Sequence, residues 1–423
     1  MRGMAPLDRR REEAGRRPLA DRAWREWAVA LASGAAAIGL IALVVEFRTT
    51  GTALFGDPGW DRHLYLEMAR RDVLDFRVAP YCWRVLGPFL AKVLPGDLQA
   101  GFAGVTVVSL VAAGPALYWL ARGTGASRAA SLAVVPLYYS LGWGARYQLS
   151  DFWVPDAPGF ALTVLTAGMV IRKHWVAAAV TIAVGVLVKE SVVFAGVLAY
   201  SWHVRSWRDW RTVVRAAVVV APGAAVLGAV RVAIRQANGD ASYLGSLPRE
   251  IGQFPELFPR YSYGERYRVI FVEQRWEHLR WADFDIYLGD PFGVPLLALA
   301  AAGVVAAPGR AARLLPFLAL AYTQLLFATD TQRLLVLGFV ALGILAAGGA
   351  DWTARRAGLP TGWVLAFCWA VFGVSLMDAP GFGSGLIRQS VLTGAGMAAA
   401  MAIRRTGLRG AVPGPRPVPP IQS

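Results

Sequence analysis

A chain of 423 residues with 56% hydrophobic residues, 17% charged residues and a mean hydropathy of +0.44 is too apolar for a soluble protein of its size. The net charge of +15 does not indicate a nucleic-acid partner, because the arginines gather in short links between apolar segments. Two cysteines far apart, Cys82 and Cys368, exclude a disulfide framework and a cysteine-based metal site.

Apolar segments recur along the chain at about the length that an α-helix needs to cross a hydrocarbon core of about 30 Å. We expect about twelve membrane-spanning helices within 27–404, at residues 27–47, 98–121, 127–146, 155–171, 175–188, 191–204, 213–235, 291–307, 313–328, 332–350, 361–378 and 385–403. A basic tail at 1–26 precedes them, and a proline-rich tail at 405–423, expected to be disordered, follows them. The pattern predicts an all-α polytopic membrane protein.

Lysine and arginine set the orientation of this topology. The tail 1–26 holds eight arginines, and every second link after it also carries lysine or arginine, which indicates that both termini are cytoplasmic. The same threading places 21 of the 28 acidic residues on the outer side or at its membrane boundary, and it places the long loops at about 48–97 and 236–290 outside. Any chemistry is therefore expected outside the cytoplasm.

The first outer loop places two carboxylates, Asp57 and Asp61, directly after the first span. Turn residues surround them, and a short amphipathic helix containing Tyr65 is predicted to follow. Asp61 is either a functional carboxylate or the N-cap of this helix.

Further along the loop, Arg84 stands among aromatic residues where the chain re-enters an apolar segment. It either binds a phosphate group with its guanidinium or rests at the interface as a snorkelling side chain. Asp156 begins a later span at its outer end, where a carboxylate either caps the helix or contributes to a site.

The pair Lys189-Glu190 interrupts a long apolar run, and ionisable residues at membrane depth usually have a function. The alternative is a mutual ion pair at a helix junction. Asp330 and Arg333 lie in a short polar turn, where they either pair locally or reach a lipid-linked phosphate. All these polar clusters are expected at one membrane face.

Four short motifs in these regions resemble the GT-C superfamily of membrane glycosyltransferases, which use sugars linked to polyprenyl phosphate. The motifs are Asp61-x3-Tyr65-x2-Met68-Ala69, Pro80-x3-Arg84-Val85-Leu86-x-Pro88, Lys189-Glu190-Ser191 and Asp330-x2-Arg333. They follow the order and topology of most of the membrane region, although each is short.

The resemblance implies a bacterial plasma-membrane enzyme that moves a sugar from a polyprenyl-phosphate donor to a glycan, lipid or protein acceptor during cell-envelope synthesis. It makes Asp61 the expected catalytic base, with Asp57 as second choice in a shifted register. The side chains expected to bind the donor phosphate and substrate are Arg84, Arg333, Tyr65, Lys189, Glu190, Asp156 and Asp330. The better-known members carry a paired Asp-Glu or an Asp-x-Asp here, and this chain carries neither. No metal ligand is therefore assigned, and dependence on a divalent cation stays open.

Two other activities share this kind of membrane region. A polymerase or ligase of lipid-linked glycans uses the same substrate class on the same face. A transporter or flippase of lipid-linked substrates would also hold charged residues between helices, but the half-to-half repeat typical of many transporters is not evident here.

Overall fold

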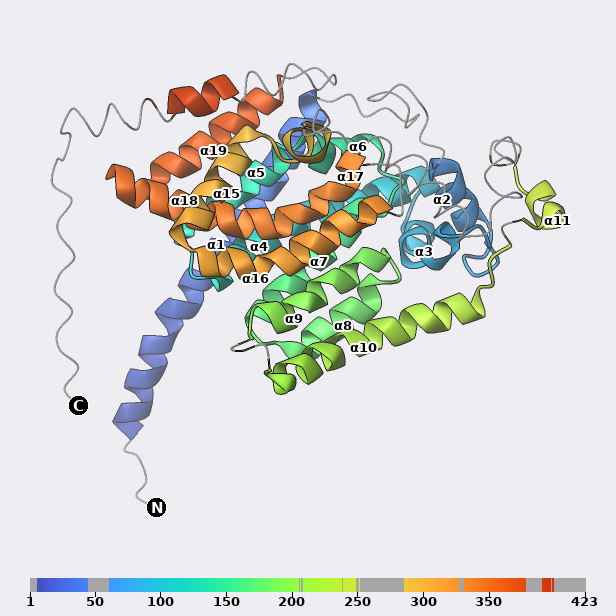
Figure 1. Ribbon diagram of the computed structural model, residues 1–423, viewed down its shortest axis with the longest axis horizontal. Coiled ribbons are helices and arrows are strands. Elements are labelled where there is room, and N and C mark those ends of the chain that lie inside the picture. The colour runs from blue at the N-terminus through green and yellow to red at the C-terminus, as the bar shows by residue number, and fades with distance from the viewer. Residues whose placement is uncertain are drawn as a thin grey trace.

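The computed structural model describes residues 6–44, 61–204, 206, 208–237, 239–248, 251, 285–326, 331–377, 390–396 and 398. Within these ranges every regular element is a helix (Figure 1). This agrees with the all-α class expected from the hydropathy pattern.

Four helical stretches are long and apolar enough to cross a membrane, judged by length and composition. They are Trp24–Val44 in α1 (Pro6–Val44), α4 (Leu98–Gly123), α10 (Trp210–Ala233) and Gln332–Ala357. The last stretch joins α17 (Thr331–Leu335), a 3-10 turn (Val336–Gly338) and α18 (Phe339–Ala357). These findings fit a membrane protein, and they support four of the twelve expected spans.

Most other expected spans fall on shorter helices. They are α7 (Asp156–Ile171), α8 (Trp175–Gly185), the 3-10 helix Glu190–Val197 with α9 (Leu198–Ser201), α15 (Val294–Ala306), α16 (Pro308–Thr323) and α19 (Thr361–Ser375). Each has 16 residues or fewer, so none reaches the length of a full membrane crossing without its flanking residues.

The span expected at 127–146 is broken. α5 (Arg128–Tyr139) ends where Leu141 turns to an extended conformation, and a π turn follows at Gly142–Arg146 with non-helical dihedral angles at Gly144. The chain then makes the single turn α6 (Tyr147–Ser150) before α7 begins. Hydropathy alone did not predict this break, because the segment stays apolar across it.

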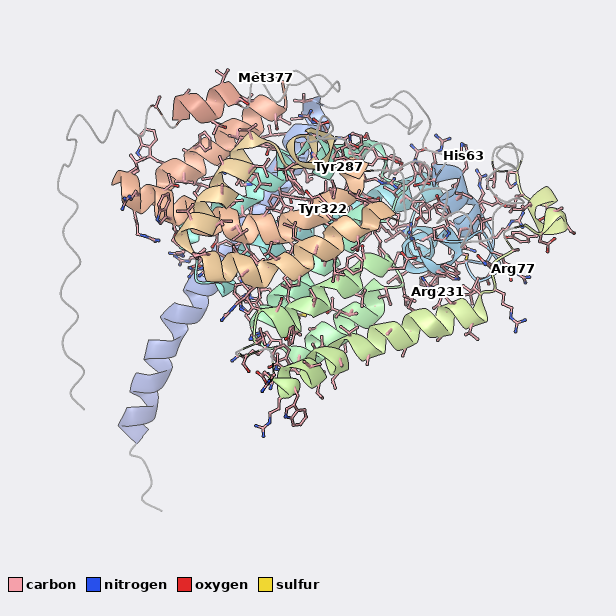
Figure 2. All side chains as sticks on the ribbon, viewed as in Figure 1. His63, Arg77, Arg231, Tyr287, Tyr322 and Met377 are labelled. Atoms are coloured by element: carbon pink, nitrogen blue, oxygen red, sulfur yellow. The ribbon has the colours of Figure 1, made fainter. Side chains whose placement is uncertain are left out.

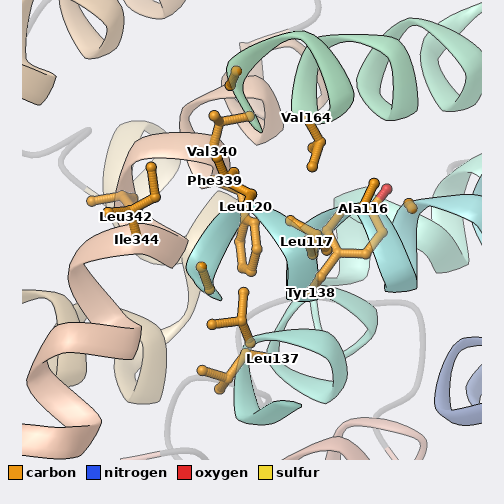
Figure 3. Close-up of a cluster of buried hydrophobic side chains, with 14 of the residues drawn as sticks. Ala116, Leu117, Leu120, Leu137, Tyr138, Val164, Phe339, Val340, Leu342 and Ile344 are labelled. Carbon is orange, nitrogen blue, oxygen red and sulfur yellow. The ribbon is translucent and has the colours of Figure 1, made fainter. Parts of the chain in front are cut away.

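A main apolar core lies where α18 packs among α4, α5, α7 and α15 (Figure 3). Aromatic side chains stack inside it, with the Tyr138 ring parallel to the Phe160 ring at 4.4 Å and edge-on to Phe339 at 5.4 Å. The most apolar 18-residue window of the Gln332–Ala357 stretch is 94% buried inside the protein, so this stretch is the central helix of the bundle.

A second apolar cluster forms at one end of the bundle. It joins α2 (Asp61–Arg70), the 3-10 turn Tyr81–Trp83 and α3 (Leu86–Val93) to the end of α10 and to the region of α11 (Ala241–Gly245). Figure 1 shows α2, α3 and α11 together at this end, and Figure 2 places His63, Arg77 and Arg231 there. This cap contains described parts of both long loops, and α2 confirms the predicted amphipathic helix.

Candidate functional site

Asp61 is the first residue of α2, and its carboxylate makes two contacts. The Tyr81 hydroxyl donates a hydrogen bond of 2.6 Å to Oδ1, and Arg333 Nη2 lies 3.2 Å from Oδ2. The side chain is 16% exposed, so the carboxylate is held by two partners and part of it stays accessible. Asp61 therefore has specific polar partners in other elements, beyond any role at the start of its own helix.

Arg333 connects four elements around Asp61. Its Nε lies 3.6 Å from Asp156 Oδ2 at the start of α7, and its Nη1 lies 3.4 Å from the Tyr147 hydroxyl in α6. Because Arg333 belongs to α17, at the start of the central helix, one guanidinium ties α2, α6 and α7 to the core. The planar guanidinium can hold several acceptors at once in this way.

Asp156 and Lys189 form the next ion pair of the same network. Both side chains are largely buried, and burying either charge without its partner would be costly. The N-cap position of α7 is occupied by Pro155, and the Asp156 oxygens contact Lys189 and Arg333. Asp156 therefore lies in the first turn of α7, as expected, and its carboxylate also has two cationic partners from other elements.

Arg84 is the centre of a second group of contacts, which meets the first at Tyr81, whose ring lies 5.4 Å from the Tyr65 ring and whose hydroxyl binds Asp61. Its Nε donates a 3.0 Å hydrogen bond to Glu190 Oε2, and its Nη1 donates a 2.9 Å hydrogen bond to the Tyr65 hydroxyl. Burial raises the pKa of Tyr65 above its ordinary value, so this phenol stays protonated. Arg84 is thus held by two partners, unlike a snorkelling side chain in solvent.

Lys189 and Glu190 pair with different partners, so the mutual ion pair considered for them is wrong. Lys189 has an extended backbone and Glu190 starts a 3-10 helix, which directs the two side chains to Asp156 and Arg84 respectively. The break between α8 and this 3-10 helix brings both charges into the site.

The charges of this network balance. Three cations, Arg84, Lys189 and Arg333, face three carboxylates. The carboxylates are those of Asp61, Asp156 and Glu190. An incoming anion would therefore compete with these carboxylates for the cations.

Sequence reasoning missed three residues that the structure brings to the site, Tyr81, Tyr147 and Asp151. Tyr81 precedes Arg84 by three residues within the motif already noted, and Asp151 lies in the same polar stretch as Asp156. The Tyr147 hydroxyl donates a 2.8 Å hydrogen bond to Asp151 Oδ2. The chain carries many other aromatic residues, so sequence alone gave no signal that Tyr147 would contact Arg333.

Burial raises the pKa of Asp151 to about 7, and the Arg333 charge and the Tyr147 hydrogen bond oppose this rise only in part. Asp151 is 4% exposed and lies between the π turn and α7, outside the four candidate spans. Its charge therefore changes near neutral pH.

Two expected site residues, Asp57 and Asp330, lie outside the described residues. Among the residues that the structure does describe, no three His, Cys, Asp or Glu side chains form a group that could hold a metal ion. Nothing in the described geometry assigns a divalent cation to this site.

No protein-family model matches this chain, and no curated protein matches it either. The chemistry of the site consequently rests on the contacts described above.

Proposed function

We propose that this protein is a membrane glycosyltransferase that moves a sugar from a polyprenyl-phosphate carrier to the hydroxyl group of a glycan, lipid or protein acceptor. The resemblance to the GT-C superfamily suggested this class, and one observation supports it best. Seven side chains expected from separate stretches of the chain form two groups of polar contacts, and Tyr81 joins the groups through its hydroxyl bond to Asp61 and its ring contacts with Tyr65 and Arg84. The seven are Asp61, Tyr65, Arg84, Asp156, Lys189, Glu190 and Arg333.

The chemistry follows from the two kinds of charge in this network. A carboxylate can take the proton of an acceptor hydroxyl while that oxygen attacks the anomeric carbon of the sugar. The bond between that carbon and the phosphate oxygen breaks, and its electron pair stays on the phosphate. Guanidinium and ammonium groups stabilise the charge that develops there. In our proposal Asp61 is the base, and Arg84 and Arg333 face the phosphate.

The ion pairs of the network add a condition to this chemistry. Arg333 holds the Asp61 carboxylate, so a bound phosphate would compete with Asp61 for the same guanidinium. When the phosphate takes over Arg333, the Asp61 carboxylate loses one of its two partners and becomes available to the acceptor hydroxyl. Binding of the donor thus prepares the base.

The proposed location follows from the distribution of lysine and arginine. We place the network at the extracytoplasmic face of a bacterial plasma membrane, with about twelve spans and both termini in the cytoplasm. The four long apolar helices agree with a membrane protein. The shorter helices would cross together with their flanking residues or in tilted and broken form.

The proposal can be tested by binding geranylgeranyl phosphate to the purified protein in lipid nanodiscs, with geranylgeraniol as the probe that lacks only the phosphate. We expect the phosphate probe to bind more tightly than the alcohol, and Arg84→Gln or Arg333→Gln to remove most of that difference. Arg70→Gln is the matched control, because Arg70 is an exposed arginine at the end of α2.

Equal affinity for the two probes, or unchanged binding in both arginine variants, would remove the lipid phosphate from the proposal. Mass spectrometry of lipid-linked sugars from a deletion strain then tests the reaction itself. A glycosyltransferase predicts that one lipid-linked sugar accumulates while one envelope glycan loses that sugar.

A further inference from the structure

The break in the helix after α5 carries a second layer of side chains toward Arg333. The π turn Gly142–Arg146 ends the apolar run, and the single turn of α6 then presents Tyr147, with Asp151 immediately after it. An unbroken span would have carried this stretch through the bundle. The interruption therefore places the Tyr147 phenol and the Asp151 carboxyl group next to the Arg333 guanidinium.

The contacts of Tyr147 have a defined direction. Its hydroxyl donates its proton to Asp151 Oδ2 at 2.8 Å, so the oxygen lone pairs remain for Arg333 Nη1 at 3.4 Å. The Arg333 guanidinium carbon also lies 5.9 Å from the centre of the Tyr147 ring, and the centre of the Trp143 ring lies 5.4 Å from the centre of the same Tyr147 ring. Arg333 is thus oriented by the hydroxyl and by the ring of one residue.

Asp151 is more than a packing residue. It is 4% exposed, and its Oδ1 has no hydrogen-bond partner among the described residues. A buried carboxyl oxygen without a partner costs stability, and such atoms are uncommon in native proteins. The groups that influence Asp151 are Tyr147 in α6, Arg333 in α17, Asp61 in α2 and Asp156 in α7. All of them belong to the network around the candidate base.

We propose that Asp151 is a positioning residue, which acts through the Tyr147 hydroxyl to hold the Arg333 guanidinium in place for the anionic group of the substrate. This inference rests on the proposed function only in taking that group to be a phosphate. The chain Asp151, Tyr147, Arg333 sets the orientation of the cation, and the charge on Asp151 sets how strongly the cation attracts an anion.

The proposal predicts a pH effect that a purely structural residue would not produce. As pH rises through neutrality Asp151 gains a negative charge close to Arg333, and this charge opposes binding of a phosphate. The affinity of the wild-type protein for geranylgeranyl phosphate should therefore fall with rising pH, relative to Asp151→Asn. The probe titrates too, but its titration is common to both proteins and cancels in the comparison. Asp75→Asn, which changes an exposed aspartate of the cap, should follow the wild type.

Tyr147→Phe removes the hydroxyl that links Asp151 to Arg333. Losing a hydrogen bond to a charged group should lower the affinity for geranylgeranyl phosphate roughly 3- to 30-fold at every pH. Adding Asp151→Asn to Tyr147→Phe should change the affinity less than Asp151→Asn does alone, because the two residues act through one link. An additive double variant would contradict this relay, and so would an Asp151→Asn variant that keeps the wild-type pH dependence.

A second measurement separates this inference from the proposed function. The rate at which phenylglyoxal modifies Arg333, followed by peptide mass spectrometry, reports how firmly the guanidinium is held without any substrate. Both Tyr147→Phe and Asp151→Ala should increase this rate, because Ala, unlike Asn, cannot accept the Tyr147 hydrogen bond, while Arg84 in the same samples should react as in the wild type. If no protein binds the phosphate probe but the Arg333 rates rise, the proposed function fails and the positioning role stands. Unchanged Arg333 rates would overturn the positioning role.

Discussion

At the scale of single residues, Asp61 can be tested for two roles, that of the catalytic base and that of a direct ligand of the substrate. A binding assay distinguishes them. If Asp61 is the base, Asp61→Asn should lower the rate of sugar transfer on the order of 10²- to 10⁴-fold. The same variant should bind geranylgeranyl phosphate roughly 2- to 10-fold more tightly, because Arg333 no longer has Asp61 as a competing partner. Asn keeps the size of the side chain and can still accept the Tyr81 hydrogen bond.

A carboxylate that bound the substrate directly would give the opposite result, with weaker binding in Asp61→Asn. Asp75→Asn removes an equal charge from the exposed surface of the same cap, so it reports any general electrostatic effect. Near wild-type transfer in Asp61→Asn would exclude Asp61 as the base.

The raised pKa of Asp151 also predicts how the stability of the protein depends on pH. Its pKa rises from an ordinary value of about 4 to about 7 in the folded protein, so the folded state binds this proton more tightly than the unfolded state. The slope of the unfolding free energy with pH is therefore negative between these two values, and the contribution of Asp151 falls as pH rises. Asp151→Asn removes this penalty. Its Tm should exceed the wild-type Tm by more at pH 8 than at pH 5, measured in the same detergent.

The sequence predicted which residues would matter at the site better than it predicted how they pair. The motifs around Asp61, Arg84 and Lys189 pointed to charged side chains at one depth, and hydropathy could show this because Asp61 and Arg84 lie beside apolar segments and Lys189 interrupts one. Partner choice depends on backbone direction at helix breaks. For that reason Lys189 pairs with Asp156 across helices and not with its neighbour Glu190.

At the scale of elements, the crossing of α15 and α18 depends on two glycines. A Cβ added at Gly349 would overlap the Leu299 carbonyl oxygen, and one at Gly303 would overlap the Leu345 carbonyl oxygen. Small residues let helices approach this closely in a membrane. Gly349→Ala should therefore destabilise the protein by about 1–3 kcal/mol and lower its Tm.

Gly373 in α19 is the matched control for this substitution, because a Cβ there meets no atom within 4 Å. Gly373→Ala should leave Tm unchanged or raise it slightly, since alanine has the higher helix propensity. Arg333 lies in α17, at the start of the same central helix that contains Gly349. Gly349→Ala should therefore also lower the affinity for geranylgeranyl phosphate. Equal Tm values for the two alanine variants would show that the crossing tolerates a methyl group.

Element positions were largely predictable because apolar length is a strong signal. The ranges expected at 98–121, 155–171 and 361–378 correspond to α4, α7 and α19 within a few residues. The broken segment at 127–146 was not predictable, because Pro136, Leu141 and Gly144 do not interrupt its hydropathy. Such breaks are tolerated where the irregular backbone is buried in protein, a condition that only the three-dimensional packing reveals.

At the scale of the whole molecule, the proposed orientation places the cap of α2, α3 and α11 outside the cytoplasm, and the arginine-rich links inside. Single cysteines can test this once Cys82 and Cys368, both buried, have been replaced. Asp75 and Asp240 are exposed positions of the cap region, and Arg211 and Arg355 are exposed positions on links expected to be cytoplasmic.

A membrane-impermeant maleimide added to intact cells should label Asp75→Cys and Asp240→Cys, and it should label Arg211→Cys and Arg355→Cys only after permeabilisation. The physical reason is that lysine and arginine resist translocation, whereas aspartate and glutamate contribute little to orientation. The network from Asp61 to Arg333 is joined to this cap through Tyr81, so its side of the membrane is fixed by the same result. Labelling of positions 211 and 355 in intact cells, with 75 and 240 protected, would place the network in the cytoplasm. A donor presented at the extracytoplasmic face could then not reach Asp61.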